Sequence, residues 1–180
     1  GLGDVYKRQH SGKWDGFRNS VNYHRGPFGL TGARAELLDD SSIINIWYNN
    51  PKNIYNSFQE IDLFFEDSIT NYEIRTILDP SIRIKTKKFN GYIKYKFSSP
   101  VDSLSFLIKK KENLQSKFYF FGFRLDNNKN GISYHSIGVN GASVPSYLRC
   151  EFLEKQLSLI IPDLVIFSIG INDAYEAVSY

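Results

Sequence analysis

Two short loops carry the residue types in this chain that are best suited to chemistry. Residues 138–142 (Gly-Val-Asn-Gly-Ala) and residues 170–173 (Gly-Ile-Asn-Asp) each follow an apolar stretch directly. Glycine at position 141 leaves its backbone N–H accessible because it has no side chain, and the amide of Asn172 supplies further N–H donors. Uncharged donors aimed at one point stabilise a developing oxyanion, and each contributes about 3–4 kcal/mol to lowering the barrier. The pattern therefore predicts an oxyanion hole made by Gly141 and Asn172. Candidate lining residues are Gly138, Asn140, Asp173 and His135.

The sequence around the two loops predicts one βαβ unit. Ile132–Ile137 is expected to be a short strand, and the apolar run Leu164–Ile169 is typical of a strand buried on both faces of a parallel sheet. Between them, a helix is expected to begin after Ser143, run to about Leu159 and stop before Pro162. A right-handed crossover brings the carboxyl ends of both strands to the same sheet edge, where open α/β folds bind ligands. The two loops should therefore lie close together.

Each loop by itself has a plainer interpretation. A Gly-x-x-Gly after a strand is usually a turn, and an Asn-Asp pair often caps a helix. Together, one helix apart and at matching strand ends, they are more specific. A dinucleotide site is disfavoured because the three-glycine fingerprint is missing. His135 precedes the first loop and is expected to be structural, with pocket lining as the alternative. No His/Cys/Asp/Glu spacing indicates a metal site, and no cofactor is expected.

The two loops resemble motif blocks of the SGNH, or GDSL, hydrolase superfamily. Residues 136–142 are similar to its second block, whose last glycine gives an oxyanion-hole N–H. Residues 162–173 are similar to its third block, Gly-x-Asn-Asp, whose asparagine gives another donor. The resemblance implies that Gly141 and Asn172 are the oxyanion residues here. It covers only the stretch from the second block to the third.

The other two blocks of that superfamily have no match in this sequence. One is a Gly-Asp-Ser motif that supplies the nucleophile, and the other is a late Asp-x-x-His that supplies the base and its orienting carboxylate. The resemblance implies a serine ester hydrolase whose serine, aspartate and histidine lie outside this chain. The chain alone is expected to be inactive.

The two ends of the chain have sequences that a sequencing adapter would encode. Residues 4–9 (Asp-Val-Tyr-Lys-Arg-Gln) match the translation of a transposon-based sequencing adapter, and residues 178–180 (Val-Ser-Tyr) match its reverse complement. We therefore interpret residues 1–9 and 178–180 as adapter-derived and leave them out of the expected fold. The rest is interpreted as an internal fragment of a longer protein.

Residues 10–130 have the pattern of an all-β domain. Apolar and polar residues alternate in short segments separated by turn residues, and Asn90-Gly91 is a strong hairpin signal. Segments of this number and spacing predict a β-sandwich. The expected strands are Ile43–Tyr48, Phe58–Glu66, Tyr72–Leu78, Ile82–Lys87, Tyr92–Phe97, Leu104–Lys109 and Lys117–Leu125.

The expected fold is mixed, with a β-sandwich over residues 10–130 and a partial α/β, flavodoxin-like SGNH unit over residues 131–177. Some bacterial members of the superfamily that act on acetylated carbohydrates insert a β-sandwich between the first and second blocks, and the order here resembles theirs. This resemblance implies an O-acetylated glycan as substrate and a secreted or envelope location. A non-catalytic carbohydrate-binding module and an O-acyltransferase on the same scaffold are the alternatives.

The composition and a few single residues exclude further classes of function. A net charge of +3 is too small for a nucleic-acid footprint, and Pro162 interrupts the longest apolar stretch, so no transmembrane segment is expected. Cys150, the only cysteine, cannot form an intrachain disulfide and is expected to be a buried structural thiol.

Several side chains of the β region invite a functional interpretation. Trp14, Trp47 and Tyr48 offer either a sugar-stacking surface or core packing, and core packing is favoured. Glu60 and Asp62 share one face of a predicted strand, which we expect to be solvated. The sequence does not define an oligomeric state.

Overall fold

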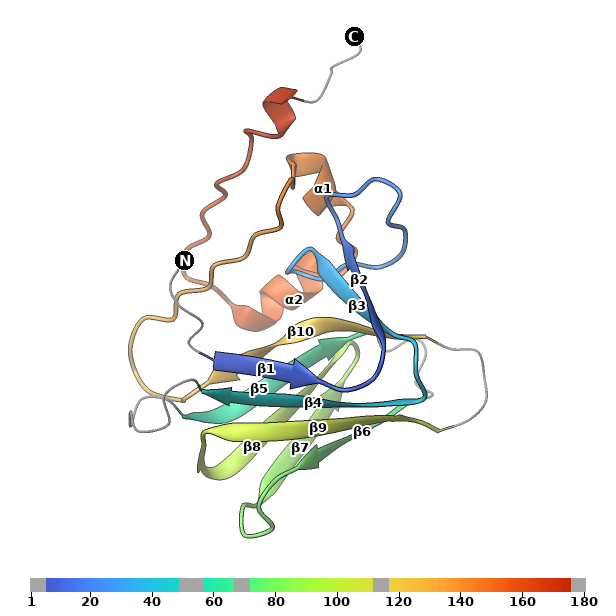
Figure 1. Cartoon of the computed structure of the whole chain (residues 1–180). Helices are drawn as coiled ribbons and strands as arrows, with labels where there is room; N and C mark the ends of the chain where they lie inside the picture. Colours follow the sequence, from blue (N-terminus) through green and yellow to red (C-terminus); the bar gives the residue numbers. More distant parts are fainter. Residues whose placement is uncertain (1–5, 49–56, 67–71, 112–116, 176–180) are drawn as a thin grey trace. The chain divides into compact units, whose positions relative to one another are not determined.

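The computed structural model describes residues 6–48, 57–66, 72–111 and 117–175. The fold is mostly β, with two antiparallel sheets and two short helices near the C-terminal end (Figure 1). The chain divides into two compact units: residues up to 15 with residues 36–132, and residues 16–35 with those from 133 onwards. The second unit thus includes a stretch, 16–35, that the sequence pattern did not set apart. Within the described ranges, no helix is long and apolar enough to cross a bilayer.

The two sheets have different sizes. The smaller sheet has the strand order β1-β4-β9-β6, and its members are β1 (Tyr6–His10), β4 (Ser41–Tyr48), β9 (Ser103–Lys110) and β6 (Tyr72–Ile77). The larger sheet has the order β2-β3-β10-β5-β8-β7, and its members are β2 (Trp14–Arg18), β3 (Ala33–Leu37), β10 (Phe118–Asp126), β5 (Phe58–Phe65), β8 (Tyr92–Val101) and β7 (Ile84–Phe89).

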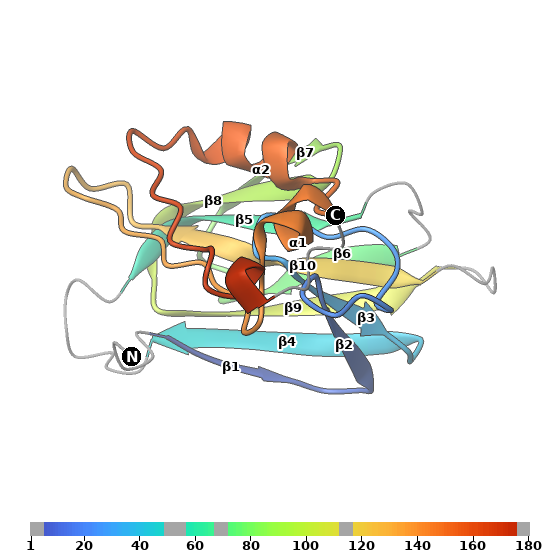
Figure 2. The same ribbon diagram turned by 90° about the horizontal axis from the view of Figure 1, so that it is seen from above.

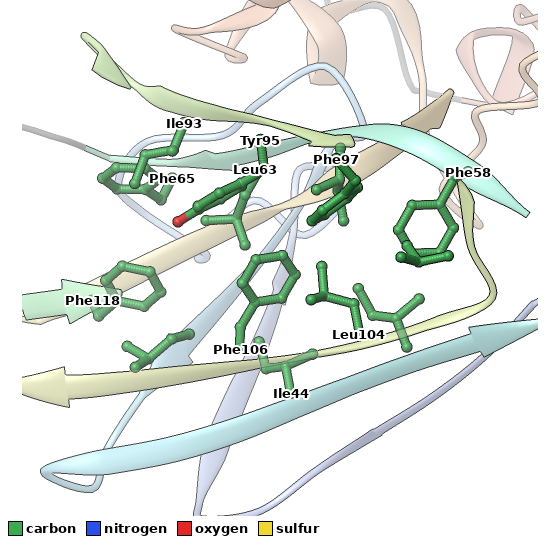
Figure 3. Close-up of a cluster of buried hydrophobic side chains, with 14 of the residues drawn as sticks. Ile44, Phe58, Leu63, Phe65, Ile93, Tyr95, Phe97, Leu104, Phe106 and Phe118 are labelled. Carbon is green, nitrogen blue, oxygen red and sulfur yellow. The ribbon is translucent and has the colours of Figure 1, made fainter. Parts of the chain in front are cut away.

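The core of the first unit forms between the inward faces of these strands (Figure 3). In β9, Leu104, Phe106 and Ile108 are buried while the residues between them are not. In β4, Ile44 and Ile46 face the same way. Alternation of this kind is what a strand needs when one of its faces packs on a core. Phe106 is completely buried, so its replacement by alanine is expected to cost about 3–5 kcal/mol.

All seven strands expected in residues 43–125 are formed, with ends shifted by a few residues. The hairpin at Asn90-Gly91 is confirmed, because Phe89 pairs with Tyr92 across a two-residue turn. Gly91 has φ +87°, a conformation that side chains disfavour.

Strand β1 corrects our exclusion of residues 1–9 from the fold. Tyr6–His10 pairs antiparallel with β4, with Gln9 opposite Asn45. The edge of a sheet presents unpaired N–H and C=O groups, and any extended segment that reaches them can form the ladder. The origin of these residues stays a prediction.

The face that carries Asp62 is not solvated as expected. Asp62 is 4% exposed, and its Oδ2 lies 2.8 Å from Nη2 of Arg124 on the neighbouring β10. Lys94 of β8 lies 3.3 Å from the other carboxylate oxygen. The strand register places both cations opposite Asp62, so the carboxylate is buried as part of an ion pair.

The second unit contains two helices where we expected one. Ser143 is confirmed as the N-cap, and α1 (Val144–Leu148) is followed after a short break by α2 (Leu153–Ile160). The break arises where the backbone N–H of Phe152 donates to Phe28 O at 3.1 Å and so leaves the helical ladder. The helical segment ends at Ile161, whose left-handed backbone precedes Pro162.

The strands expected at Ile132–Ile137 and Leu164–Ile169 are not formed, so this part of the prediction is wrong for the described chain. Both segments are extended, run side by side in the same direction in both views (Figures 1 and 2) and are exposed. No backbone hydrogen bond joins them within the described ranges. A lone parallel pair has no neighbouring strands and no helices on its faces, so too little burial offsets the entropy of ordering it.

Candidate functional site

The site begins with the loop that ends the first extended segment. Gly141 has φ +78°, in the left-handed region that glycine tolerates best. A Cβ added there would lie 3.8 Å from the nearest atom, Cβ of Ser20. Backbone conformation, rather than lack of space, therefore favours glycine at this position. Among the described residues, the N–H of Gly141 has no hydrogen-bond acceptor.

The second loop reaches the first through Asn172. Its Nδ2 donates to the backbone carbonyl of Ala142 at 2.8 Å, which places the amide one residue along the chain from Gly141. The second Nδ2 hydrogen has no acceptor among the described residues. The structure thus brings the loops of Gly141 and Asn172 together, and their catalytic role stays a prediction.

Asp173 forms a second link between the loops. Its Oδ1 accepts from the backbone N–H of Val144, the first residue of α1, at 2.9 Å. The first-turn N–H groups of a helix have no intrahelical acceptor, so a side-chain oxygen here stabilises the helix start. Asp173 itself begins the 3-10 turn η1 (Asp173–Tyr175).

Ser20 also holds the Gly141 loop, and the sequence analysis missed it. Its Oγ donates to the backbone carbonyl of Asn140 at 2.9 Å, across 120 residues of sequence. Nothing in the residues around Ser20 marks this contact. Ser20 lies in the connection between β2 and β3, which belongs to the same unit as the two loops.

A buried polar cluster anchors that connection to α1. Asn19 is completely buried, its Nδ2 donates to Sγ of Cys150 at 3.4 Å, and its backbone carbonyl accepts from Nη2 of Arg149. A Cβ on Gly32 would lie 2.7 Å from Asn19 Nδ2, so only glycine fits there. Cys150 is confirmed as a buried thiol, and burial raises its pKa. A thiolate nucleophile is therefore disfavoured at this position.

The same connection packs on α2. Leu30 N donates to Oε1 of the buried Gln156 at 2.7 Å. Arg34 is 5% exposed, lies over the rings of Phe17 and Phe28, and donates to the carbonyls of Arg25 and Pro27. Residues 19–34 therefore contact α2 and the residues that follow α1.

Two of the candidate lining residues are not brought to the site. His135 is exposed and lies six residues before Gly141 on an extended segment. Gly138 is exposed, and a Cβ there would meet nothing within 4 Å. Among the described residues, the backbone carbonyl of Asn140 accepts from Ser20 and the Asn140 side chain has no hydrogen bond.

The donors in these two loops have the chemistry that one step of acyl transfer needs, and their role in such a step stays a prediction. Gly141 N–H and the Asn172 amide offer neutral donors in adjacent loops, which suits an oxyanion. Within the ranges that the structure describes, no serine hydroxyl is hydrogen-bonded to a histidine, and no group of His, Cys, Asp and Glu could hold a metal ion.

Comparison with known proteins shows a fold and no family. No family model matches the sequence, and no curated protein does. A solved structure of a peptidoglycan O-acetylesterase matches with a TM-score of 0.64 at 18% identity, over 94% of this chain and 44% of that one. The chain therefore spans less than half the length of that protein. A solved structure of a β-galactosidase from Streptococcus pneumoniae matches with a TM-score of 0.41 at 7% identity, over 70% of this chain and 99% of that one, which is too weak a likeness to carry an argument.

Proposed function

We propose that this chain is part of a serine ester hydrolase of the SGNH type that deacetylates O-acetylated carbohydrate. The N–H of Gly141 and the side-chain amide of Asn172 form the oxyanion hole. The serine, histidine and aspartate belong to parts of the protein that this sequence does not include. The observation that supports the proposal is the hydrogen bond from Asn172 Nδ2 to the backbone carbonyl of Ala142, because it joins the two loops that carry the donors.

In this proposal the two donors act on the acetyl carbonyl. The serine hydroxyl adds to the carbonyl carbon while the histidine accepts its proton, and the carbonyl electron pair moves to oxygen. Gly141 N–H and Asn172 Nδ2–H stabilise the resulting oxyanion. Collapse of the tetrahedral intermediate breaks the bond to the sugar oxygen, which takes the proton from the histidine and leaves as a hydroxyl. Water then gives a proton to the histidine and adds to the acyl-enzyme, and acetate leaves as the serine oxygen regains that proton.

The arrangement of the second unit supports a flavodoxin-like core. The two extended segments run in the same direction and form no ladder with each other among the described residues. In a flavodoxin-like sheet of order 2-1-3, the first strand lies between the second and third. If these segments are the second and third strands, the strand that carries the serine would pair with both of them. The likeness to a peptidoglycan O-acetylesterase supports an acetylated glycan as substrate, and such a protein would act in the cell envelope or outside the cell.

The test uses the complete reading frame that contains this sequence. The purified protein is expected to release acetate from O-acetylated peptidoglycan, and Asn172→Ala is expected to lower kcat by about 10²–10³-fold. Asn140→Ala is the matched control, because the Asn140 side chain has no hydrogen bond to the part of the chain that the structure describes. The 180-residue chain alone is expected to show no turnover. Full activity of Asn172→Ala would contradict the proposal, and transfer of acetyl to another sugar in place of acetate release would indicate an acyltransferase.

A further inference from the structure

The first unit has an open groove at one end of its smaller sheet. Its volume is about 880 Å³, and its walls come from β4, from β9, from the ends of β6 and β8 with the segments that follow them, and from Ser57 and Lys129. Every lining residue belongs to the first unit. The groove is thus separate from the Gly141 and Asn172 loops, and nothing in the proposed ester hydrolysis uses it.

Residues of both faces of the smaller sheet line the groove, with Ile46 and Leu104 from the inward face and Asn45, Trp47, Ser103 and Ser105 from the outward face. Trp47 lies opposite Ser103, and Asn45 lies opposite Ser105, in the register of β4 with β9. The inward neighbour Ile46 is buried in the core, so Asn45 and Trp47 face the other way. Trp47 is partly exposed and lies outside the core cluster, and within the described chain its indole N–H has no acceptor. Trp14 and Tyr48, by contrast, pack against the core as expected.

Some donors and acceptors of the polar groups around Trp47 are not used by the described residues. Ser105 Oγ donates to Oδ1 of Asn45 at 2.6 Å, which leaves both hydrogens on Asn45 Nδ2 available. Asp102 Oδ1 accepts from Ser103 Oγ at 2.9 Å, and Asp79 Oδ1 accepts from the N–H of Ser81 at 2.8 Å. The Oδ2 atom of Asp102 has no partner among the described residues, and the Asp79 carboxylate also interacts with the Ser81 side chain. These internal bonds fix the side chains while leaving donors and acceptors for a ligand.

We propose that this groove binds a neutral, hydroxyl-rich oligosaccharide. A sugar ring has an apolar C–H face that packs on an aromatic ring, and Trp47 supplies that ring. Its hydroxyls donate to carboxylates and accept from amides, and Asp79, Asp102 and Asn45 supply those groups. The two carboxylates outnumber Lys129, the one cation among the described lining residues, and so disfavour phosphates and other anions. A partly apolar concave surface with a few fixed polar groups is the usual form of a small-ligand site.

The proposal is tested by binding of chitotetraose and cellotetraose to the 180-residue chain. The chain has only two tryptophans, so its NMR spectrum contains two indole N–H signals, which the Trp47→Ala variant assigns. We expect saturable binding of at least one tetrasaccharide at millimolar concentration, with a shift of the Trp47 signal and no shift of the Trp14 signal. If chitotetraose binds and cellotetraose does not, the groove recognises the acetamido groups of chitotetraose.

Variants separate the groove from the rest of the molecule. Trp47→Ala is expected to weaken binding at least about tenfold. If that variant does not fold, the isosteric double variant Asp79→Asn/Asp102→Asn replaces it, with about tenfold weaker binding expected. Tyr23→Ala removes another exposed aromatic ring, outside the groove, and should leave affinity unchanged.

Three outcomes would overturn the proposal. The first is no binding of either tetrasaccharide, and the second is binding that none of the groove variants weakens. The third is binding of the cationic tetraglucosamine only, lost at high salt, which would indicate a charge site. Esterase activity enters none of these measurements, so failure here and failure of the proposed function are independent.

Discussion

The side-chain amide of Asn172 donates to the backbone carbonyl of Ala142 at 2.8 Å, although 30 residues separate them. Asp173 adds a bond to Val144 at 2.9 Å over a similar span. Two consecutive side chains of one loop thus hold the loop before α1 and the start of that helix. The two extended segments approach each other at these ends without forming a ladder, so side-chain contacts rather than strand pairing define the candidate site.

Replacement of Gly141 should strain the first loop. Gly141→Ala is expected to lower the free energy of unfolding by about 1 kcal/mol, because its φ of +78° is unfavourable for a residue with a Cβ. Gly138→Ala is the control, since Gly138 lies outside the left-handed region and has open space around it. Urea denaturation measures both. Equal losses for the two variants would show that the left-handed backbone at 141 is not the cause.

The sequence predicts the strands of the first unit well because their pattern is local. One-face burial requires alternation, and segments such as Tyr92–Phe97 alternate visibly. β2 (Trp14–Arg18) and β3 (Ala33–Leu37) were not predicted, since Gly16 and the helix-favouring Ala, Arg, Glu and Leu of β3 do not mark a strand. Pairing with neighbouring strands overrides those preferences.

The residues of the candidate site likewise divide into those that the sequence predicts and those that it does not. Gly141 and Asn172 could be named because each ends an apolar stretch with an unusual residue combination. Ser20 and Asn19 could not, because their contacts with Asn140 and Cys150 span more than a hundred residues and no local pattern encodes them. The same holds for Asp62, whose burial depends on cations from two neighbouring strands.

Loss of the Asp62 charge should be costly. Asp62→Asn removes the nearer carboxylate of Arg124 and leaves it only Asp126, at 4.0 Å, so we expect a destabilisation of up to about 3 kcal/mol. The control is Glu73→Gln, which breaks the exposed pair with Arg75 and should cause no measurable change. Urea denaturation of the two variants and of the parent protein measures these changes in the free energy of unfolding. A small effect at Asp62 would mean that water solvates the carboxylate in the folded protein.

The core tyrosine Tyr95 should make stability fall at high pH. Burial raises its pKa to about 12 from an ordinary value of 10.0, and Figure 3 shows its ring among apolar core side chains. Between these values the unfolded chain loses the phenolic proton while the folded chain keeps it, so unfolding becomes easier as pH rises. The effect is absent below pH 10 and reaches at most about 2–3 kcal/mol near pH 12.

Tyr95→Phe isolates this contribution, because phenylalanine has no proton to lose. The difference in stability between the variant and the parent protein, measured by urea denaturation at a series of pH values, should shift in favour of the variant above pH 10. Other tyrosines titrate in both proteins and cancel in the difference. A difference that stays constant across this range would show that Tyr95 titrates normally.

The extended segments of the second unit should make the chain associate with itself. Ile132, Leu164, Ile166 and Phe167 are 70% to 99% exposed, and their backbone N–H and C=O groups have no partner among the described residues. Exposed apolar side chains beside unpaired backbone groups favour addition of another strand. Light scattering during size-exclusion chromatography is expected to show a mass that rises with protein concentration.

Charge placed on these segments should suppress the association. The double variant Ile166→Lys/Phe167→Lys puts one cation on each side of an extended segment, so either edge pairing or face packing would bring like charges together. Leu38→Lys is the control, because Leu38 is an exposed apolar residue of the first unit, at 51%, away from both segments in sequence. If the double variant associates as strongly as the parent while folding normally, another surface mediates the contact. If the parent stays monomeric at every concentration, the two segments are covered within the chain itself, and the exposure on which this prediction depends is not present in solution.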